Sequence, residues 1–186
     1  LMRSSAASDV YKRQGCGPLK EAIADYEHTK KEYLICGNGA ADLIFSLSRA
    51  LNPKKALLPA PTFAEYEQAL VSVGCEISRY YLKEENDFCI QKDYPDVLKR
   101  EKPDIIFLCN PNNPTGITIP QDLLEEILET CAMQGIFMVV DECFLDFVKD
   151  PGKHTLKEKL AKYPGLFILK AFTKRYAIPG VRLGYG

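Results

Sequence analysis

The segment Ile136-Phe137-Met138-Val139-Val140-Asp141-Glu142 has the strongest signal for a buried β-strand in the chain. Five apolar residues follow Gly135 without interruption, and two carboxylates come directly after them. A continuous apolar run of this length, bounded by a glycine, is typical of a strand covered on both faces. Other strand-like runs occur at residues 33–36, 56–58, 75–82, 104–109 and 166–169.

The segments between these runs have the three- and four-residue apolar spacing of amphipathic helices. The helices expected are at 18–28, along Leu43 to Leu51, from Thr62 as N-cap to Gly74, at 93–100, from Pro120 in a first turn to Gly135, and near 155–162. Because strands and helices alternate with short connections, the sequence predicts an α/β fold with a mostly parallel sheet and helices on both faces.

The composition limits the classes of function. The chain has 186 residues, enough for one domain, and 26% of them are charged. A formal net charge of −1 gives no reason to expect nucleic acid or an anionic membrane as a partner. No apolar run approaches the ~20 residues that a membrane-spanning helix needs.

The cysteines and histidines argue against a disulfide framework and a metal site. Seven cysteines are scattered without a C-x-x-C pair, which is typical of reduced thiols in a cytoplasmic protein. The two histidines, His28 and His154, have no ligand spacing, so no zinc site is expected.

Both ends of the chain are unusual for a complete protein. It opens on Leu1 and stops at Gly186 within a strand-like segment. Residues 1–14 show neither a helical period nor the apolar region of a signal peptide. We therefore expect a fragment in which residues 1–14 are non-native or disordered and residues 15–186 form one incomplete domain.

Polar residues follow four of the predicted strands: Asn38, Asn113, Asp141 and Lys174. Ligands of parallel α/β sheets bind beyond the carboxyl ends of the strands, where these residues lie. A carboxylate directly after a buried strand is unfavourable unless a positive group meets it. The positive group that meets Asp141 could be a protonated pyridine nitrogen of a ligand or a nearby lysine. Alternatively, the Asp141 carboxylate could cap a helix.

The segment after the strand at 166–169 carries an amine and phosphate-binding groups. Thr173 and Lys174 are adjacent, and Arg182 follows eight positions later, beyond a Pro-Gly pair. A lysine on a loop that leaves a buried strand can be partly desolvated, which makes its amine nucleophilic. A guanidinium and a hydroxyl suit a phosphate, so the segment could hold pyridoxal phosphate (PLP) as a Schiff base. A solvated Lys/Arg pair would give the same sequence.

Two turns and one aromatic residue could contact the same ligand. The turn at Gly37–Ala41 opens a helix and offers backbone N–H groups to a phosphate, although a simple tight turn would look alike. The Asn110–Gly116 turn has two prolines and could aim Asn112 or Asn113 at a ligand, or be an ordinary loop. Phe63 could stack on a planar ring or belong to the core.

Taken together, Asn113-Pro114-Thr115-Gly116, then Asp141, then Thr173-Lys174 with Arg182 resemble the fold-type I PLP enzymes of the class I/II aminotransferase family in order and separation. The resemblance extends roughly from Gly17 to Gly186. It implies that residues 15–186 form a PLP-binding large domain without its C-terminal small domain. It also implies a homodimeric parent protein that acts on a small-molecule substrate.

The resemblance implies a role for each matched residue. Lys174 would form the Schiff base with PLP, Asp141 would pair with the pyridine nitrogen, and Asn113 would hydrogen-bond the phenolic oxygen. Phe63 would stack on the ring. The phosphate would be held by Gly39, Ala40, Ala41, Thr173 and Arg182.

Two residues depart from the common family pattern. Ala171 stands where many relatives have a phosphate-binding Ser or Thr, and Phe144 stands where many aminotransferases have a Tyr. Phe144 and the segment Thr173–Tyr185 resemble the threonine-phosphate decarboxylases of cobalamin synthesis, within the histidinol-phosphate aminotransferase branch. This implies a PLP-dependent decarboxylase of a phosphorylated amino acid. The alternatives are an aminotransferase of histidinol phosphate and a cofactor-binding fragment without activity of its own.

Overall fold

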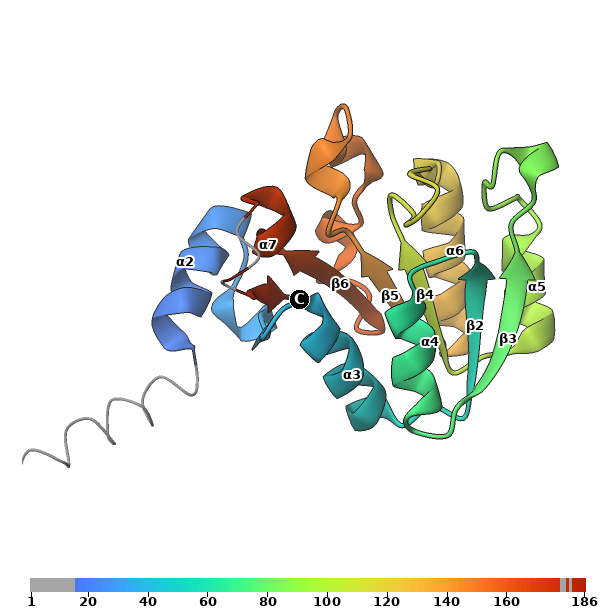
Figure 1. Ribbon diagram of the computed structural model, residues 1–186, viewed down its shortest axis with the longest axis horizontal. Helices are drawn as coiled ribbons and strands as arrows, with labels where there is room; N and C mark the ends of the chain where they lie inside the picture. The colour runs from blue at the N-terminus through green and yellow to red at the C-terminus, as the bar shows by residue number, and fades with distance from the viewer. Residues whose placement is uncertain (1–15, 178–179, 181) are drawn as a thin grey trace, which may run out of the picture.

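The computed structural model describes residues 16–177, 180 and 182–186, and these form one seven-stranded sheet with the order β1-β7-β6-β5-β4-β2-β3 (Figure 1). The strands are β1 (Cys36–Gly37), β2 (Lys55–Ala60), β3 (Glu76–Tyr81), β4 (Ile105–Cys109), β5 (Phe137–Asp141), β6 (Leu166–Ala171) and β7 (Gly184–Tyr185). Strands β2 to β6 pair in parallel, and β7 pairs antiparallel with both β6 and β1. The prediction of a mostly parallel α/β sheet is confirmed.

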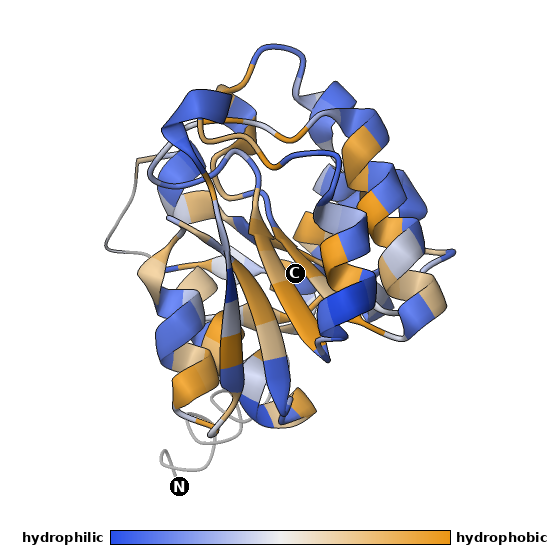
Figure 2. Ribbon diagram, turned by 90° about the vertical axis from the view of Figure 1, so that its right-hand side faces the viewer, coloured by the Kyte–Doolittle hydropathy of each residue, from blue (hydrophilic) through white to orange (hydrophobic). Residues whose placement is uncertain are grey.

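Helices cover both faces of this sheet. The helices are α2 (Gly17–Glu27), α3 (Ala40–Leu51), α4 (Ala64–Val71), α5 (Tyr94–Glu101), α6 (Gln121–Gln134) and α7 (Phe172–Arg175). Helices α5 and α6 share one hydrophobic cluster with the sheet, and α3 and α4 share another. Figure 2 shows hydrophobic colours along the central strands and both kinds of colour on the helices, as expected for amphipathic helices on a buried sheet.

The alternation along β5 shows how one strand serves both clusters. Met138 and Val140 pack in the cluster under α5 and α6, whereas Val139 packs in the cluster under α3 and α4. Successive side chains of a strand point to opposite faces, so Asp141 faces α3 and α4. Glu142, the residue after the strand, faces the other side.

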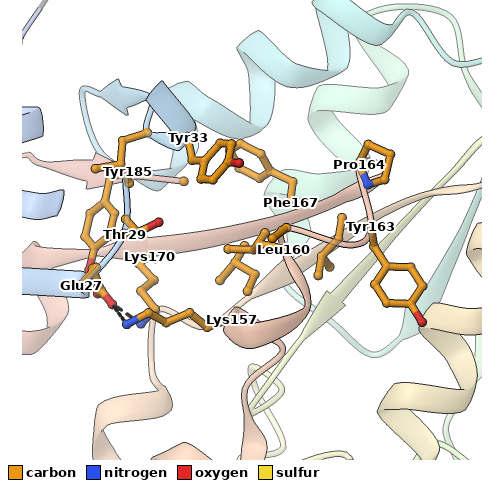
Figure 3. Close-up of a pocket in the computed structure, with 15 residues that line it drawn as sticks. Glu27, Thr29, Tyr33, Lys157, Leu160, Tyr163, Pro164, Phe167, Lys170 and Tyr185 are labelled. Carbon is orange, nitrogen blue, oxygen red and sulfur yellow. Dashed lines mark hydrogen bonds and ion pairs between the residues drawn. The ribbon is translucent and has the colours of Figure 1, made fainter. Parts of the chain in front are cut away.

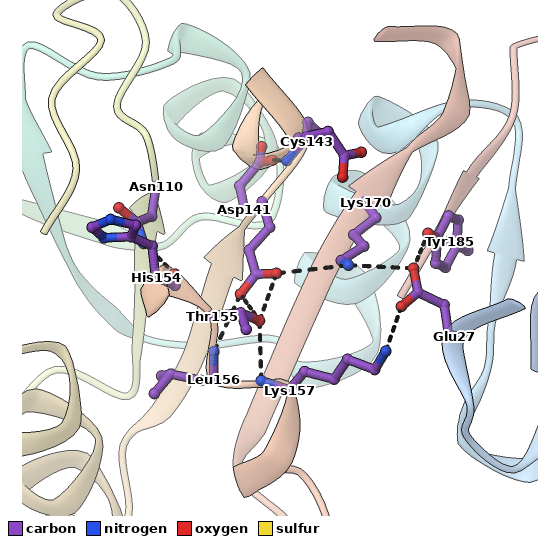
Figure 4. Close-up of polar contacts among 12 residues, drawn as sticks. Glu27, Asn110, Asp141, Cys143, His154, Thr155, Leu156, Lys157, Lys170 and Tyr185 are labelled. Atoms are coloured by element: carbon purple, nitrogen blue, oxygen red, sulfur yellow. Dashed lines mark hydrogen bonds and ion pairs between the residues drawn. The ribbon is translucent and has the colours of Figure 1, made fainter. Parts of the chain in front are cut away.

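Helix α2 is attached to the edge of the sheet by a small apolar cluster and by ion pairs. Ile23 and Ala24 pack against Leu34 and Tyr185. At the end of the helix, Glu27 accepts hydrogen bonds from the side chains of Lys157 (2.8 Å), Lys170 (3.3 Å) and Tyr185 (2.5 Å) (Figure 4).

Two predicted elements near this edge differ from the structure. The segment 33–36 is not a buried strand: Lys31–Tyr33 is a 3₁₀ turn, and Tyr33 and Ile35 are exposed. Pairing is limited to β1 (Cys36–Gly37) and to the backbone hydrogen bonds that Ile35 exchanges with Gly186. The predicted helix near 155–162 is reduced to a 3₁₀ turn at Lys157–Lys159. Tertiary hydrogen bonds from Thr155 and Leu156 to the Glu142 carboxylate compete with helix formation there.

The starts of two helices also differ. Thr62 does not cap α4, because its hydroxyl donates to Asn112 Oδ1 (2.9 Å) and the N-cap position belongs to Phe63. Pro120 is the N-cap of α6 rather than a residue of its first turn. These shifts of one residue leave the helices otherwise where they were expected.

We expect Glu27→Gln to remove a stabilising contribution that depends on pH. Burial opposes ionisation of Glu27, but hydrogen bonds from Lys157 and Tyr185 and the charge of Lys170 outweigh it and lower its pKa from 4.5 to about 2. A carboxyl with a lowered folded-state pKa stabilises the fold above its unfolded-state pKa, and this contribution is lost as pH falls toward the folded-state value. The difference in unfolding free energy between wild type and variant, measured with urea, should therefore shrink from about pH 4.5 to about pH 2.

Glu21→Gln is the matched control on the same helix. It breaks an exposed ion pair between Glu21 and Lys31, and exposed pairs contribute little to stability. Equal losses of unfolding free energy in Glu21→Gln and Glu27→Gln would contradict a stabilising role for Glu27 and its three hydrogen-bond donors.

Candidate functional site

A cavity of about 200 Å³ opens at the carboxyl ends of the parallel strands, between the sheet and the starts of α3 and α4. The structure brings all nine residues to which the resemblance gave a role into its lining, whereas Asn38 and Asn112 do not line it. The lining residues are Gly39, Ala40, Ala41, Phe63, Glu65, Cys109, Asn113, Asp141, Cys143, Phe144, Ala171, Thr173, Lys174 and Arg182. Their roles toward a cofactor stay predictions, but their convergence is a property of the fold.

Asp141 is buried at the inner wall of this cavity with 5% of its surface exposed. The hydroxyl of Tyr66 donates to its Oδ2 (2.6 Å), and the backbone N–H of Cys143 donates to its Oδ1 (2.9 Å). Among the described residues, no cation forms an ion pair with Asp141. The alternative of an ion pair between Asp141 and a lysine is therefore wrong. The carboxylate accepts the Cys143 N–H in the turn that follows β5 and also borders the cavity.

Tyr66 is a site residue that sequence reasoning missed. Its ring stacks on Phe107 (centroids 4.9 Å apart) and meets the edge of Phe63 (5.5 Å). Burial, and then the neighbouring carboxylate of Asp141, raise the pKa of Tyr66 well above its ordinary value, so it remains a hydrogen-bond donor. The available signal was its position three residues after Phe63, on one face of a helix.

An anion cradle forms at the start of α3. Its N-cap is Gly39, with φ of 86° and no side chain to satisfy the first helical N–H groups. The Arg182 guanidinium lies against this turn, since a Cβ built on Gly39 would be 3.4 Å from Arg182 Nη2. Free N–H groups at a helix N-terminus beside a guanidinium are suited to phosphate.

Strand β7 supports the cradle from behind. A Cβ built on Gly184 would be 2.5 Å from the carbonyl carbon of Gly39 and 2.6 Å from the amide nitrogen of Ala40. Only a glycine at position 184 lets the two backbones approach so closely.

Lys174 differs from its expected surroundings in two respects. It lies in the four-residue helix α7 rather than on a loop, and its side chain is exposed rather than desolvated. Its Nζ atom lies 5.3 Å from the centroid of the Phe144 ring, and no ion pair to it occurs among the described side chains. The amine is therefore accessible to a ligand in the cavity.

Asn112 and Asn113 differ in their contacts. The amide of Asn112 donates to Pro61 O and Thr115 Oγ1 and accepts from Thr62, so it holds the turn together. Asn113 has none of these contacts and lines the cavity.

Glu65 is a second lining residue that sequence reasoning missed. Its Oε2 atom is buried without a hydrogen-bond partner among the described residues. A buried, unpaired polar atom is uncommon in a folded protein, but nothing in the pattern around position 65 distinguishes this glutamate from an ordinary helix residue.

A second, larger cavity of about 290 Å³ lies on the opposite face of β6 (Figure 3). Its walls are mostly apolar and include Leu160, Tyr163 and Phe167. The charged groups at one end, Glu27 and its lysine partners, already pair with one another. They leave no unpaired charge for catalysis, so the smaller cavity is the candidate active site.

Within residues 16–177, 180 and 182–186, no helix combines the length and apolar character that crossing a membrane requires. The same part of the chain contains no group of three or more His, Cys, Asp or Glu side chains placed to hold a metal ion.

Comparison with known proteins identifies the family. A family model described as aminotransferase class I and II matches residues 6–186. The chain belongs to this family. PLP, the cofactor that the resemblance implied, is the cofactor of this family. The cavity fits it, because an exposed amine, a buried carboxylate and an anion cradle are the groups that an aldehyde, a pyridine nitrogen and a phosphate require.

Individual relatives fall into two activities. Threonine-phosphate decarboxylase of Salmonella typhimurium is 36% identical over 167 residues, 90% of this chain and 45% of the relative. The structure of a decarboxylase from Sulfurospirillum multivorans matches with a TM-score of 0.82 and 31% identity over 90% of this chain and 48% of that one. The structure of histidinol-phosphate aminotransferase from Clostridium acetobutylicum matches with a TM-score of 0.80 and 30% identity, over 90% of this chain and 48% of that one. The chain thus spans about half the length of these relatives.

We expect Tyr66→Phe to lower the unfolding free energy by about 2 kcal/mol, because it removes a buried hydrogen bond to a carboxylate. The matched control is Tyr94→Phe, since the Tyr94 ring is also fully buried but its hydroxyl has no partner among the described residues. That variant should be neutral or slightly stabilising. Urea unfolding of both variants measures the difference, and equal losses would contradict the assigned hydrogen bond.

Proposed function

We propose that the full-length protein is a PLP-dependent enzyme that decarboxylates a phosphorylated amino acid, O-phosphothreonine, to aminopropanol phosphate. The proposal rests on the meeting of the Lys174 amine, the buried Asp141 carboxylate and the Gly39–Arg182 cradle in one cavity. Such an activity would belong to cobalamin synthesis. The expected partners are the substrate and a second copy of the protein in a homodimer.

The residues of the cavity divide the work of holding the cofactor. Bound PLP supplies an electron sink for the electron pair released at the substrate Cα. Lys174 would hold it covalently, and the cradle at Gly39 would bind its phosphate through backbone N–H groups and Arg182. Asp141, fixed by Tyr66, would accept the hydrogen bond of the protonated ring nitrogen.

Asn113 and Phe63 would fix the orientation of the ring. Asn113 can donate its amide N–H to the phenolic oxygen, and its neighbour Asn112 keeps the turn rigid. Phe63 is partly buried at the start of α4 and presents an aromatic wall to the cavity. Both residues therefore restrict rotation of a planar ligand rather than take part in proton transfer.

Decarboxylation breaks the bond between Cα and the carboxylate carbon of the substrate, so the carboxylate leaves as CO₂ and Cα takes up one proton. Lys174 supplies the amine of the cavity lining and can deliver that proton. The nearby Phe144 ring has no hydroxyl, so it offers Lys174 the face of an aromatic ring and no competing proton.

Two observations favour decarboxylation over the alternative. Phe144 replaces the Tyr that many aminotransferases of the family carry, and a threonine-phosphate decarboxylase is similar to this chain at 36% identity. An aminotransferase of histidinol phosphate is the second candidate, since such a structure matches nearly as well. There, Lys174 would carry the Cα proton to the cofactor instead of delivering one to Cα.

The two candidates predict different products from the full-length protein loaded with PLP. We expect CO₂ release from O-phosphothreonine and no consumption of 2-oxoglutarate with histidinol phosphate. Radiometric CO₂ capture and a coupled glutamate assay measure the two reactions in parallel. Consumption of 2-oxoglutarate without CO₂ release would reverse the order of the candidates. The absence of both reactions would contradict the proposed substrate class.

We expect Lys174→Ala to abolish covalent attachment of PLP, because this substitution removes the predicted nucleophilic amine. Borohydride reduction followed by digestion and mass spectrometry locates the modified lysine in the wild type. Lys153→Ala, which removes an exposed lysine outside the cavity, is the control and should keep the label. Retention of the label on Lys174→Ala would contradict the assignment.

A further inference from the structure

Two charged residues lie directly behind the candidate site, on the opposite face of the sheet. Glu142 follows Asp141 in the chain, and Lys170 lies near the end of β6, four residues before Lys174. Neither residue lines the site cavity. Their effect on the site, if any, must pass through the backbone of the two strands that carry Asp141 and Lys174.

The two residues belong to a buried chain of ion pairs and hydrogen bonds. The Glu142 side chain is fully buried, and its two oxygens accept from the Thr155 hydroxyl at 2.8 and 2.9 Å. Lys170 Nζ lies 3.9 Å from Glu142 Oε2 and 3.3 Å from Glu27 Oε1. Figure 4 shows Lys170 between Thr155 on one side and Glu27 with Tyr185 on the other.

Backbone contacts couple this chain to the strand ends. The N–H of Glu142 donates to the carbonyl of Leu169 (2.8 Å), and Asp141 is the register partner of Leu169. The Lys170–Glu142 pair therefore joins β5 and β6 next to Asp141 and four residues before Lys174. Separation of the pair would leave the buried Glu142 carboxylate with only the neutral donors Thr155 and Leu156, which opposes rearrangement.

We propose that Lys170 and Glu142 are positioning residues whose ion pair sets the placement of Asp141 relative to Lys174, so that both reach one cofactor ring. This inference rests on the proposed function, since it assumes that PLP attaches to Lys174. A displacement of about 1 Å between groups that act on one ligand can reduce a rate about 100-fold, so a fixed strand register matters to the site.

The competing explanation is that the cluster only anchors α2 and the nearby turn. Lys157 separates the two explanations, because it also pairs with Glu27, at 2.8 Å, but lies on a 3₁₀ turn away from β5 and β6. Loss of Lys157 should weaken the anchor without changing the strand ends. Loss of Lys170 should both weaken the anchor and change the strand ends.

The test uses the full-length protein without cofactor and two measurements. The thermal midpoint reports folding, and the rate at which the visible absorbance of lysine-bound PLP appears after mixing reports the placement of the site. The variants are Lys170→Met, Lys157→Met and the double variant Lys170→Met/Glu142→Gln, which removes the pair without leaving a buried charge alone. Lys170→Arg, which keeps the charge, is the conservative control and should attach PLP at a rate near that of the wild type.

We expect Lys157→Met to lower the midpoint and keep the wild-type attachment rate. The double variant should recover most of the midpoint lost by Lys170→Met, while its attachment rate stays about tenfold or more below that of the wild type. Should Lys170→Met fail to fold, the double variant carries the comparison. Attachment by the double variant at the wild-type rate, or equal slowing by Lys157→Met, would overturn the inference. Failure of the wild type to attach PLP would instead refute the proposed function.

Discussion

The backbone pairing of β5 with its two neighbours is the constraint on which the site depends. Cys109 is level with Asp141, so β4 and β5 end together, and β6 continues two residues past Leu169, the partner of Asp141. Side chains alternate between faces, so this register turns Asp141 toward α4 and Glu142 toward the opposite side. A slip of one residue would exchange the two carboxylates and leave both without their hydrogen-bond partners.

Different partners offset the cost of burying the two adjacent carboxylates, Asp141 and Glu142. Asp141 has neutral donors, a tyrosine hydroxyl and a backbone N–H, so it stays available to a cationic ligand. Glu142 has a threonine hydroxyl and a lysine within 4 Å. Burial raises the pKa of Glu142 to about 7, although the charge of Lys170 and the hydrogen bond from Thr155 act against this rise. The sheet thus separates a carboxylate that borders the cavity from one that belongs to the cluster of ion pairs on the opposite face.

The sequence supported the sheet and the membership of the cavity for a physical reason. Continuous apolar runs identify buried parallel strands, and the ends of such strands converge, so Asn113, Asp141 and Lys174 could be placed together without coordinates. Tyr66 could not, because its bond to Asp141 depends on how α4 packs across the sheet. The 3₁₀ turn at Lys157–Lys159 was not predicted for a similar reason. Thr155 and Leu156, at the start of the expected helix, donate hydrogen bonds to Glu142 instead. Local pattern identifies elements, but contacts between elements decide exposure and hydrogen-bond partners.

The support of the anion cradle by β7 has a consequence for biosynthesis. The backbones of Gly39 and Gly184 pack closely, and Cys36 pairs with Tyr185, so β7 supports a turn that is distant from it in the sequence. During synthesis, the turn at Gly39 lacks the support of Gly184 until the segment that carries β7 has also been made. Closure of such distant contacts is slow and comes late in folding. Binding of an anion at the cradle would then require that β7 has already joined the sheet.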